Sequence, residues 1–222
     1  MTVFVKICGL STEASVRVAT QSGADCIGLV FFPKSPRNVS LERAEALAAI
    51  AREAPGVKVA ALVVDADDDL LAAIVRRIKP DLLQLHGSET PERVAEIGRR
   101  FGVATMKAVG VREAADLDTV ARYQSVADRV LLDAKPPKGA DLPGGNGVAF
   151  DWSLLESLDL DNRFMLSGGL NPKTVAAALL QTGISGVDVS SGVESAPGVK
   201  DPRLIAEFVD AVRRQALEGE DP

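Results

Sequence analysis

In the stretch GISGVDVSSGVESAPGVKDPRLIAEFVDAV (183–212), a short apolar run is followed by a loop of small residues and then by a segment of helical period. The run at 186–189 has the length and composition of a strand. The apolar residues that recur at spacings of three and four are Leu204, Ile205, Phe208, Val209 and Val212. Strand, loop and helix in this order predict one βα unit.

The same unit recurs along the chain. Eight apolar runs alternate with helical segments, and most are continuously apolar, as in parallel strands that are buried on both faces. The predicted strands are 3–8, 26–31, 57–63, 82–85, 105–108, 129–133, 164–166 and 186–189. The repetition favours an α/β fold with a single (β/α)8 TIM barrel over 1–217 and an acidic tail at 218–222. An open doubly wound sheet would show a similar pattern.

Residues at the ends of the helical segments agree with this division. Small polar residues that cap helix N-termini precede three segments, and glycines that cap C-termini follow three others. The predicted N-caps are Ser11, Ser40 and Asp201, and the predicted C-caps are Gly23, Gly102 and Gly183.

Composition excludes several classes of function. The chain of 222 residues has 25 basic and 31 acidic side chains, and this net charge of −6 disfavours nonspecific binding to nucleic acid. No apolar run is long enough for a membrane span or a signal peptide. Cys8 and Cys26 lack metal-ligand spacing, and His86 is the only histidine, so we expect no metal site. We expect a cytoplasmic protein.

In a barrel of this kind, active-site residues lie at the carboxyl ends of the strands. Cys8 ends the first predicted strand, and Lys6, two residues earlier, lies on the same face, where its charge would favour a basic thiolate. Asp133 ends the sixth and is a candidate general acid. It opens a segment rich in proline and glycine, 134–147, which we interpret as a mobile lid. The plainer alternatives are an inert cysteine, a loop cap and a surface loop.

The loops after the seventh and eighth strands, SGGLNP (167–172) and DVSSGVE (188–194), have the composition of a phosphate site, and barrels commonly bind phosphate there. Arg37, in a loop whose freedom Pro33 and Pro36 limit, could present its planar guanidinium to a carboxylate. We expect small-molecule substrate contacts from Lys6, Arg37, Gln84, His86, Gly144, Gly145, Gly168, Gly169, Asp188, Ser190, Ser191 and Gly192.

Seven segments together resemble the phosphoribosylanthranilate isomerase family. They are KICGL (6–10), GLVFFPKSPR (28–37), LLQLHG (82–87), LLDAK (131–135), PGGNGVAFDW (143–152), LSGGLNP (166–172) and GVDVSSGVE (186–194), and they span nearly the whole chain in order. Two positions depart from the commoner pattern: Asn146 after the GG pair and Ser167 before GGL. Neither is the expected acid or base.

The resemblance implies an enzyme of tryptophan biosynthesis without a metal or organic cofactor. It would convert N-(5'-phosphoribosyl)anthranilate into 1-(o-carboxyphenylamino)-1-deoxyribulose 5-phosphate by an Amadori rearrangement. The resemblance assigns the general base to Cys8, the general acid to Asp133 and the grip on the anthranilate carboxylate to Arg37.

Two alternatives stay open at this point. The similar barrel isomerase of histidine biosynthesis performs the same rearrangement, but it has an aspartate where Cys8 stands and resembles two half-barrels. A barrel that binds a sugar phosphate without turnover is the second alternative, and the joint presence of Cys8, Asp133 and Arg37 disfavours it. We expect a monomer or a homodimer.

Overall fold

The computed structural model describes residues 2–135, 139, 142–145, 147 and 149–218. The predicted tail, apart from the backbone of Glu218, lies outside this part of the chain, as do Asn146 and much of the predicted lid. The extent of the domain and the mobility of the lid therefore stay predictions.

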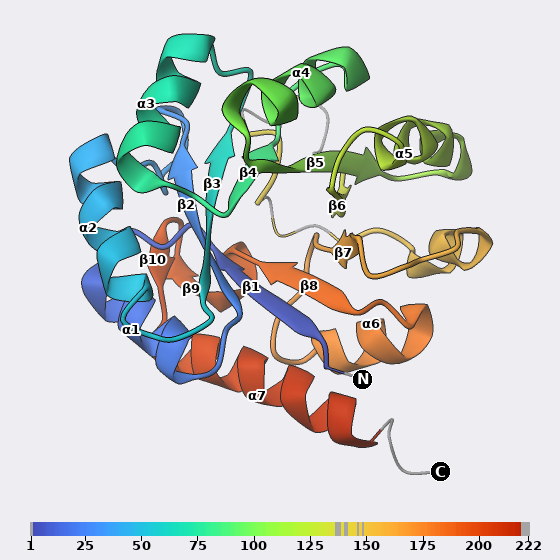
Figure 1. The fold of residues 1–222 in the computed structure, drawn as a ribbon. Coiled ribbons are helices and arrows are strands. Elements are labelled where there is room, and N and C mark those ends of the chain that lie inside the picture. Colours follow the sequence, from blue (N-terminus) through green and yellow to red (C-terminus); the bar gives the residue numbers. More distant parts are fainter. Residues whose placement is uncertain (1, 136–138, 140–141, 146, 148, 219–222) are drawn as a thin grey trace.

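Eight parallel strands close into a barrel, and helices surround it (Figure 1). The strands are β1 (Phe4–Cys8), β2 (Cys26–Phe31), β3 (Lys58–Val63), β4 (Leu82–Leu85), β5 (Ala104–Val111), β6 (Arg129–Ala134), β7 (Phe164–Leu166) and β8 (Gly186–Val189). Closure is made by β1 and β8, which pair from Phe4 with Gly186 to Ile7 with Val189. This pairing confirms the predicted (β/α)8 barrel and excludes the open sheet.

The helices follow the strands in the predicted alternation, with one exception. They are α1 (Glu13–Gln21), α2 (Leu41–Ala51), α3 (Asp68–Ile78), α4 (Pro91–Phe101), α5 (Leu117–Gln124), α6 (Val175–Thr182) and α7 (Pro202–Glu218), with the short 3-10 helix η1 (Ala114–Asp116) before α5. In the described residues of the sixth unit, the 3-10 helix η2 (Trp152–Ser157) stands where we expected an α-helix. After β8 come the 3-10 turn η3 (Ser191–Val193) and an unpredicted hairpin of β9 (Glu194–Ala196) and β10 (Val199–Lys200).

Four of the six predicted helix caps are confirmed. Ser40 caps α2 by accepting from the Arg43 backbone N–H, the Arg203 N–H donates to Asp201, and Gly102 and Gly183 end α4 and α6 in the left-handed conformation. Ser11 is wrong by one residue, because Thr12 forms a reciprocal capping box with Ser15. Gly23 is also wrong by one residue, because the cap of α1 is Ser22.

The barrel interior changes from apolar to polar along the strands. Toward the amino ends, a buried cluster contains Cys26, Ala60, Leu82, Met106, Ala108, Leu131 and Met165. Burial there raises the pKa of the Cys26 thiol to about 12. On β4, Gln84 stands two residues beyond Leu82 on the same strand face. On β1, Cys8 stands two residues beyond Lys6, which pairs with Cys26 of the cluster. The apolar plug thus supports a floor of polar side chains.

Among the described residues, no helix is both long and apolar enough to cross a membrane.

Candidate active site

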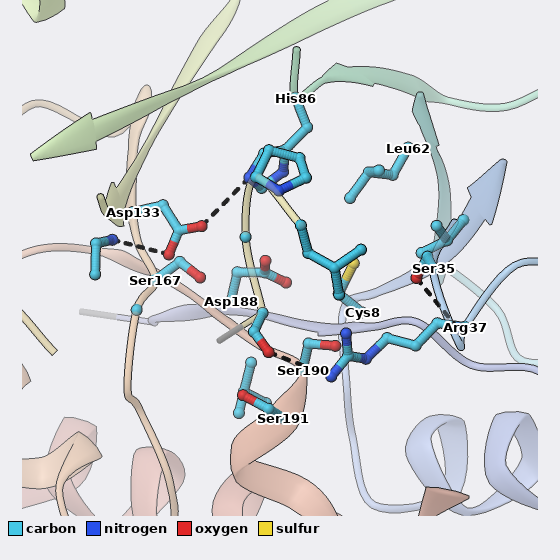
Figure 2. A pocket seen from close by; sticks show the side chains of 18 of the residues that line it. Cys8, Ser35, Arg37, Leu62, His86, Asp133, Ser167, Asp188, Ser190 and Ser191 are labelled. Atoms are coloured by element: carbon cyan, nitrogen blue, oxygen red, sulfur yellow. Dashed lines mark hydrogen bonds and ion pairs between the residues drawn. The ribbon is translucent and has the colours of Figure 1, made fainter. Parts of the chain in front are cut away.

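A cavity opens at the carboxyl ends of the strands, above the polar floor (Figure 2). Every residue that we predicted for the site contributes to its lining except Lys6. The predicted residues that line it are Cys8, Arg37, Gln84, His86, Asp133, Gly144, Gly145, Gly168, Gly169, Asp188, Ser190, Ser191 and Gly192. The closed topology brings together residues that are up to 184 positions apart, from Cys8 to Gly192.

Lys6 lies beneath the cavity and does not line it. Its side chain is fully buried, and Nζ donates to Asp188 Oδ1 at 2.9 Å. Burial by itself would lower the pKa of Lys6, but the negative partners, Asp188 first, raise it above its ordinary value. The structure therefore places Lys6 outside the cavity lining and pairs its charge with Asp188, and the predicted direct contact of Lys6 with the substrate stays a prediction.

The thiol of Cys8 faces the cavity and is 3% exposed. Burial raises its pKa above the ordinary value of 9.0, and Asp188 acts in the same direction, whereas Lys6 and Lys200 oppose them. We expected Lys6 to make the thiolate accessible near neutral pH. That expectation is wrong for the free site, because desolvation exceeds the attraction of the lysines.

Asp133, near the end of β6, lies in a row with His86, which directly follows β4, and Gln84, which is on β4. Its Oδ1 accepts from the Ala134 backbone N–H at 2.9 Å, and its Oδ2 lies 3.3 Å from His86 Nε2. His86 Nδ1 is in turn 3.1 Å from the amide nitrogen of Gln84. Asp133 and His86 point toward one another in Figure 2. These contacts therefore fix the orientation of the Asp133 carboxyl group.

Arg37 is held by a carboxylate that the sequence interpretation did not identify. Its Nε and Nη2 donate to the two oxygens of Glu194 at 2.7 and 2.9 Å, so one edge of the guanidinium is already occupied. Lys200 donates to the same carboxylate at 2.8 Å and to the Ser190 carbonyl at 2.8 Å. Burial opposes ionisation of Glu194, but hydrogen bonds and charges from Arg37 and Lys200 lower its pKa below the ordinary value. Nη2 also donates to the Gly145 carbonyl oxygen at 3.4 Å, so within the described part of the chain Nη1 is the nitrogen of Arg37 left for a ligand.

Glycines allow three loops to approach one another around the cavity. A Cβ on Gly192 would lie 1.8 Å from the Leu170 carbonyl oxygen, so the loops after β7 and β8 touch through backbone. A Cβ on Gly144 would lie 2.5 Å from His86 Nε2, and one on Gly145 would lie 2.8 Å from Arg37 Nη1. The described part of the predicted lid therefore lies against both the acid side and the arginine side of the cavity.

The family model described as N-(5'phosphoribosyl)anthranilate (PRA) isomerase matches residues 5–211. The chain belongs to this family. Two relatives with the name N-(5'-phosphoribosyl)anthranilate isomerase, from Brucella canis and Brucella suis, are each 54% identical over 213 residues, which is 96% of this chain and 95% of theirs.

Solved structures of phosphoribosylanthranilate isomerases share the fold. The enzyme from Thermotoga maritima superposes with a TM-score of 0.85 at 34% identity, over 96% of this chain and all of that one. A family structure in complex with reduced 1-(o-carboxyphenylamino)-1-deoxyribulose 5-phosphate superposes with a TM-score of 0.81 at 32% identity, over 96% of this chain and all of that one. The resemblance drawn from the seven motifs is confirmed.

Proposed function

We propose that the chain isomerises N-(5'-phosphoribosyl)anthranilate to 1-(o-carboxyphenylamino)-1-deoxyribulose 5-phosphate, the Amadori step of tryptophan biosynthesis. Membership of the isomerase family supports the activity. The observation that carries the mechanism is that a buried thiol and a carboxyl group, Cys8 and Asp133, face one cavity whose other walls suit two anions.

The two anionic ends of the substrate would be held at different walls. Backbone and hydroxyl groups of Gly169, Ser190, Ser191 and Gly192 line the wall made by the loops after β7 and β8, which suits the phosphate. Nη1 of Arg37, whose guanidinium Glu194 keeps in place, suits the anthranilate carboxylate. Two fixed ends would place the ribose between Asp133 and Cys8.

The proposed reaction begins with a proton from Asp133 to the furanose ring oxygen. The bond between that oxygen and carbon 1 breaks, and the nitrogen lone pair forms an iminium at carbon 1. The thiolate of Cys8 then takes the proton from carbon 2, and the electron pair of that bond neutralises the iminium as an enolamine. Tautomerisation of the enolamine gives the ketone. These steps use only the side chains named here.

The raised pKa of Cys8 agrees with this order of events. The iminium of the first step places a positive charge on the substrate between the two groups, and a nearby positive charge favours a thiolate. The intermediate would therefore stabilise the Cys8 thiolate that must deprotonate it. The thiol would stay protonated, and so protected from oxidation, in the free site.

We expect the pH dependence of kcat/KM to fall at high pH with a midpoint above pH 9. The productive enzyme carries an ionised Cys8 and a proton on the acid. Above the pKa of Cys8 no further thiolate forms, and a higher pH only removes the proton that the acid must donate, so activity declines. Because burial raises the pKa of Cys8 above 9.0, we expect kcat/KM to decline only at alkaline pH. The measurement is kcat/KM from about pH 6 to 10.5, and a decline centred below about pH 8 would contradict the assignment.

We expect Gly192→Ala to raise KM for the phosphorylated substrate at least about tenfold, because the loops after β7 and β8 must separate to admit a Cβ that overlaps the Leu170 carbonyl oxygen. Gly98→Ala is the matched control. Its Cβ would meet Thr105 Cγ2 at an ordinary 3.4 Å, within helix α4 and away from the cavity, so KM should not change. An unchanged KM in Gly192→Ala would show that this wall does not hold the phosphate.

The experiment that tests the proposed function in cells is complementation. A bacterial strain that lacks its own phosphoribosylanthranilate isomerase and needs tryptophan should grow without tryptophan when it expresses the wild-type chain. Asp133→Asn, of nearly equal shape, should not restore growth at equal expression. A strain that lacks the corresponding isomerase of histidine biosynthesis separates the alternative activity, and we expect no growth there.

Two coarser properties complete the proposal. We propose a cytoplasmic location, which suits the free thiols of Cys8 and Cys26. We propose a monomer or a homodimer, to be decided by light scattering; one solved family structure is described as monomers of the dimeric enzyme from Thermotoga maritima.

A further inference from the structure

Gln84 carries a buried acceptor that has no partner. Its side chain, on β4, is fully buried, and its Oε1 makes no hydrogen bond within the described part of the chain. An unpaired buried polar atom is costly, so its presence beside an active site calls for a function. Its Nε2 lies 3.1 Å from His86 Nδ1, and His86 Nε2 lies 3.3 Å from Asp133 Oδ2. Gln84, which carries the unpaired oxygen, is thus linked through His86 to the proposed acid, Asp133.

The observed positions of Gln84, His86 and Asp133 fit the state in which the His86–Asp133 pair has no proton to transfer. With Asp133 ionised and His86 neutral, Nε2 carries the imidazole hydrogen and donates to Asp133. Nδ1 then has a free lone pair and accepts from the amide nitrogen of Gln84, as the geometry shows. Gln84 Oε1 is left over in this state.

When the His86–Asp133 pair takes up one proton, His86 Nδ1 needs a hydrogen-bond acceptor from Gln84 in place of a donor. The proton resides either on Asp133, which then donates to Nε2, or on His86 as an imidazolium that donates to Asp133. In both cases Nδ1 carries a hydrogen and needs an acceptor. A half-turn of the Gln84 amide brings Oε1 to the position of its nitrogen and supplies that acceptor, with no movement of the backbone.

We propose that Gln84 is a positioning residue that stabilises the proton-loaded form of the His86–Asp133 pair by presenting Oε1 to His86 Nδ1. The inference rests on the proposed function, in which this proton passes from Asp133 to the ring oxygen. We expected Gln84 and His86 to bind substrate; this inference gives them a role through Asp133.

Other charged groups around the His86–Asp133 pair are engaged with partners of their own. Two cavities meet at His86 and Asp133, and the ion pairs among the charged side chains that line them are Arg37–Glu194, Asp188–Lys6, Lys107–Glu89 and Asp116–Lys135. The remaining titratable groups of the two linings are Cys8 and Tyr123, and the Tyr123 hydroxyl donates to the Glu89 carbonyl at 2.8 Å.

Nitrogen NMR of the imidazole tests the proposal without turnover. His86 is the only histidine, so a chain with labelled histidine nitrogens gives a single imidazole spectrum. In substrate-free wild type at high pH, Nδ1 should be unprotonated and Nε2 should carry the hydrogen. As the pH falls and the pair takes up its proton, Nδ1 should become protonated.

Two variants test the role of Gln84 in this transition. Gln84→Met keeps the size but removes the acceptor, so the midpoint of Nδ1 protonation should move about one pH unit lower, because a charge-assisted hydrogen bond is lost. Gln84→Glu offers only acceptors, so the midpoint should move higher. Gln124→Met, outside both cavities, should leave the midpoint unchanged.

The NMR results that would overturn the inference differ from the result that would refute the proposed function. An Nδ1 that is protonated at high pH in wild type, or a midpoint that stays in place in both Gln84 variants, would overturn the inference. If one variant does not fold, the other and the wild-type spectrum still decide it. A wild-type chain without isomerase activity would refute the proposed function and leave the NMR result intact.

Discussion

Replacing Cys8 by serine is expected to lower kcat at least about a thousandfold, which is within the range that a positioned general base contributes. Serine has nearly the same shape, so the cavity keeps its form, but its hydroxyl is a far weaker acid than a thiol and provides almost no anion to take the carbon 2 proton. KM should change little, because the anionic ends of the substrate contact other walls.

Cys26→Ser is the matched control for this variant. It changes the other cysteine of the chain to the same residue, within the apolar plug at the opposite end of the barrel. Burial raises the pKa of Cys26 to about 12, so it has no thiolate at neutral pH to contribute. Turnover in Cys26→Ser should remain near wild type. Turnover in Cys8→Ser within about tenfold of wild type would remove Cys8 from the role of base.

Replacing Lys6 by methionine is expected to destabilise the fold by about 3–5 kcal/mol. Methionine keeps most of the buried volume but leaves the carboxylate of Asp188 without the ammonium that it contacts at 2.9 Å. Removing one member of a buried ion pair leaves the other charge desolvated and uncompensated. The measurement is the free energy of unfolding from urea denaturation, followed by far-UV circular dichroism.

A second substitution distinguishes this cause from simple loss of packing. Lys6→Met combined with Asp188→Asn removes the orphaned charge, so the double variant should be more stable than Lys6→Met alone. Arg17→Met breaks an exposed ion pair with Glu53 and should not shift the unfolding midpoint. Equal stability of the single and double variants would indicate that the charge of Asp188 does not cause the loss.

The residues that sequence predicts well are those whose environment follows from strand order alone. Continuous apolar runs locate the strands because both faces of a barrel strand are buried. Cys8, Asp133 and Ser190 could be assigned to one site because each ends or follows a strand, and closure of the barrel brings those positions together.

The properties that sequence predicted poorly depend on contacts between distant segments. The pKa of Cys8 moves opposite to expectation chiefly because burial disfavours the thiolate, and also because Asp188, from β8, pairs with Lys6 across the β1–β8 pairing. Glu194 and Lys200 were missed because a hairpin of five strand residues has no apolar periodicity. Glu194 was inside a quoted motif, and the opposite charge of Arg37 was the only signal for its role.

The measurement that tests the account most directly is the conversion of N-(5'-phosphoribosyl)anthranilate by the purified wild-type chain, followed as loss of the anthranilate-type fluorescence. Asp133→Asn and Cys8→Ser serve as matched proteins of the same fold. We predict catalysed loss of fluorescence with wild type and severely reduced loss, with substrate binding retained, in both variants. A wild-type chain that binds the substrate but leaves its fluorescence unchanged would contradict the account and indicate a barrel that only binds a sugar phosphate.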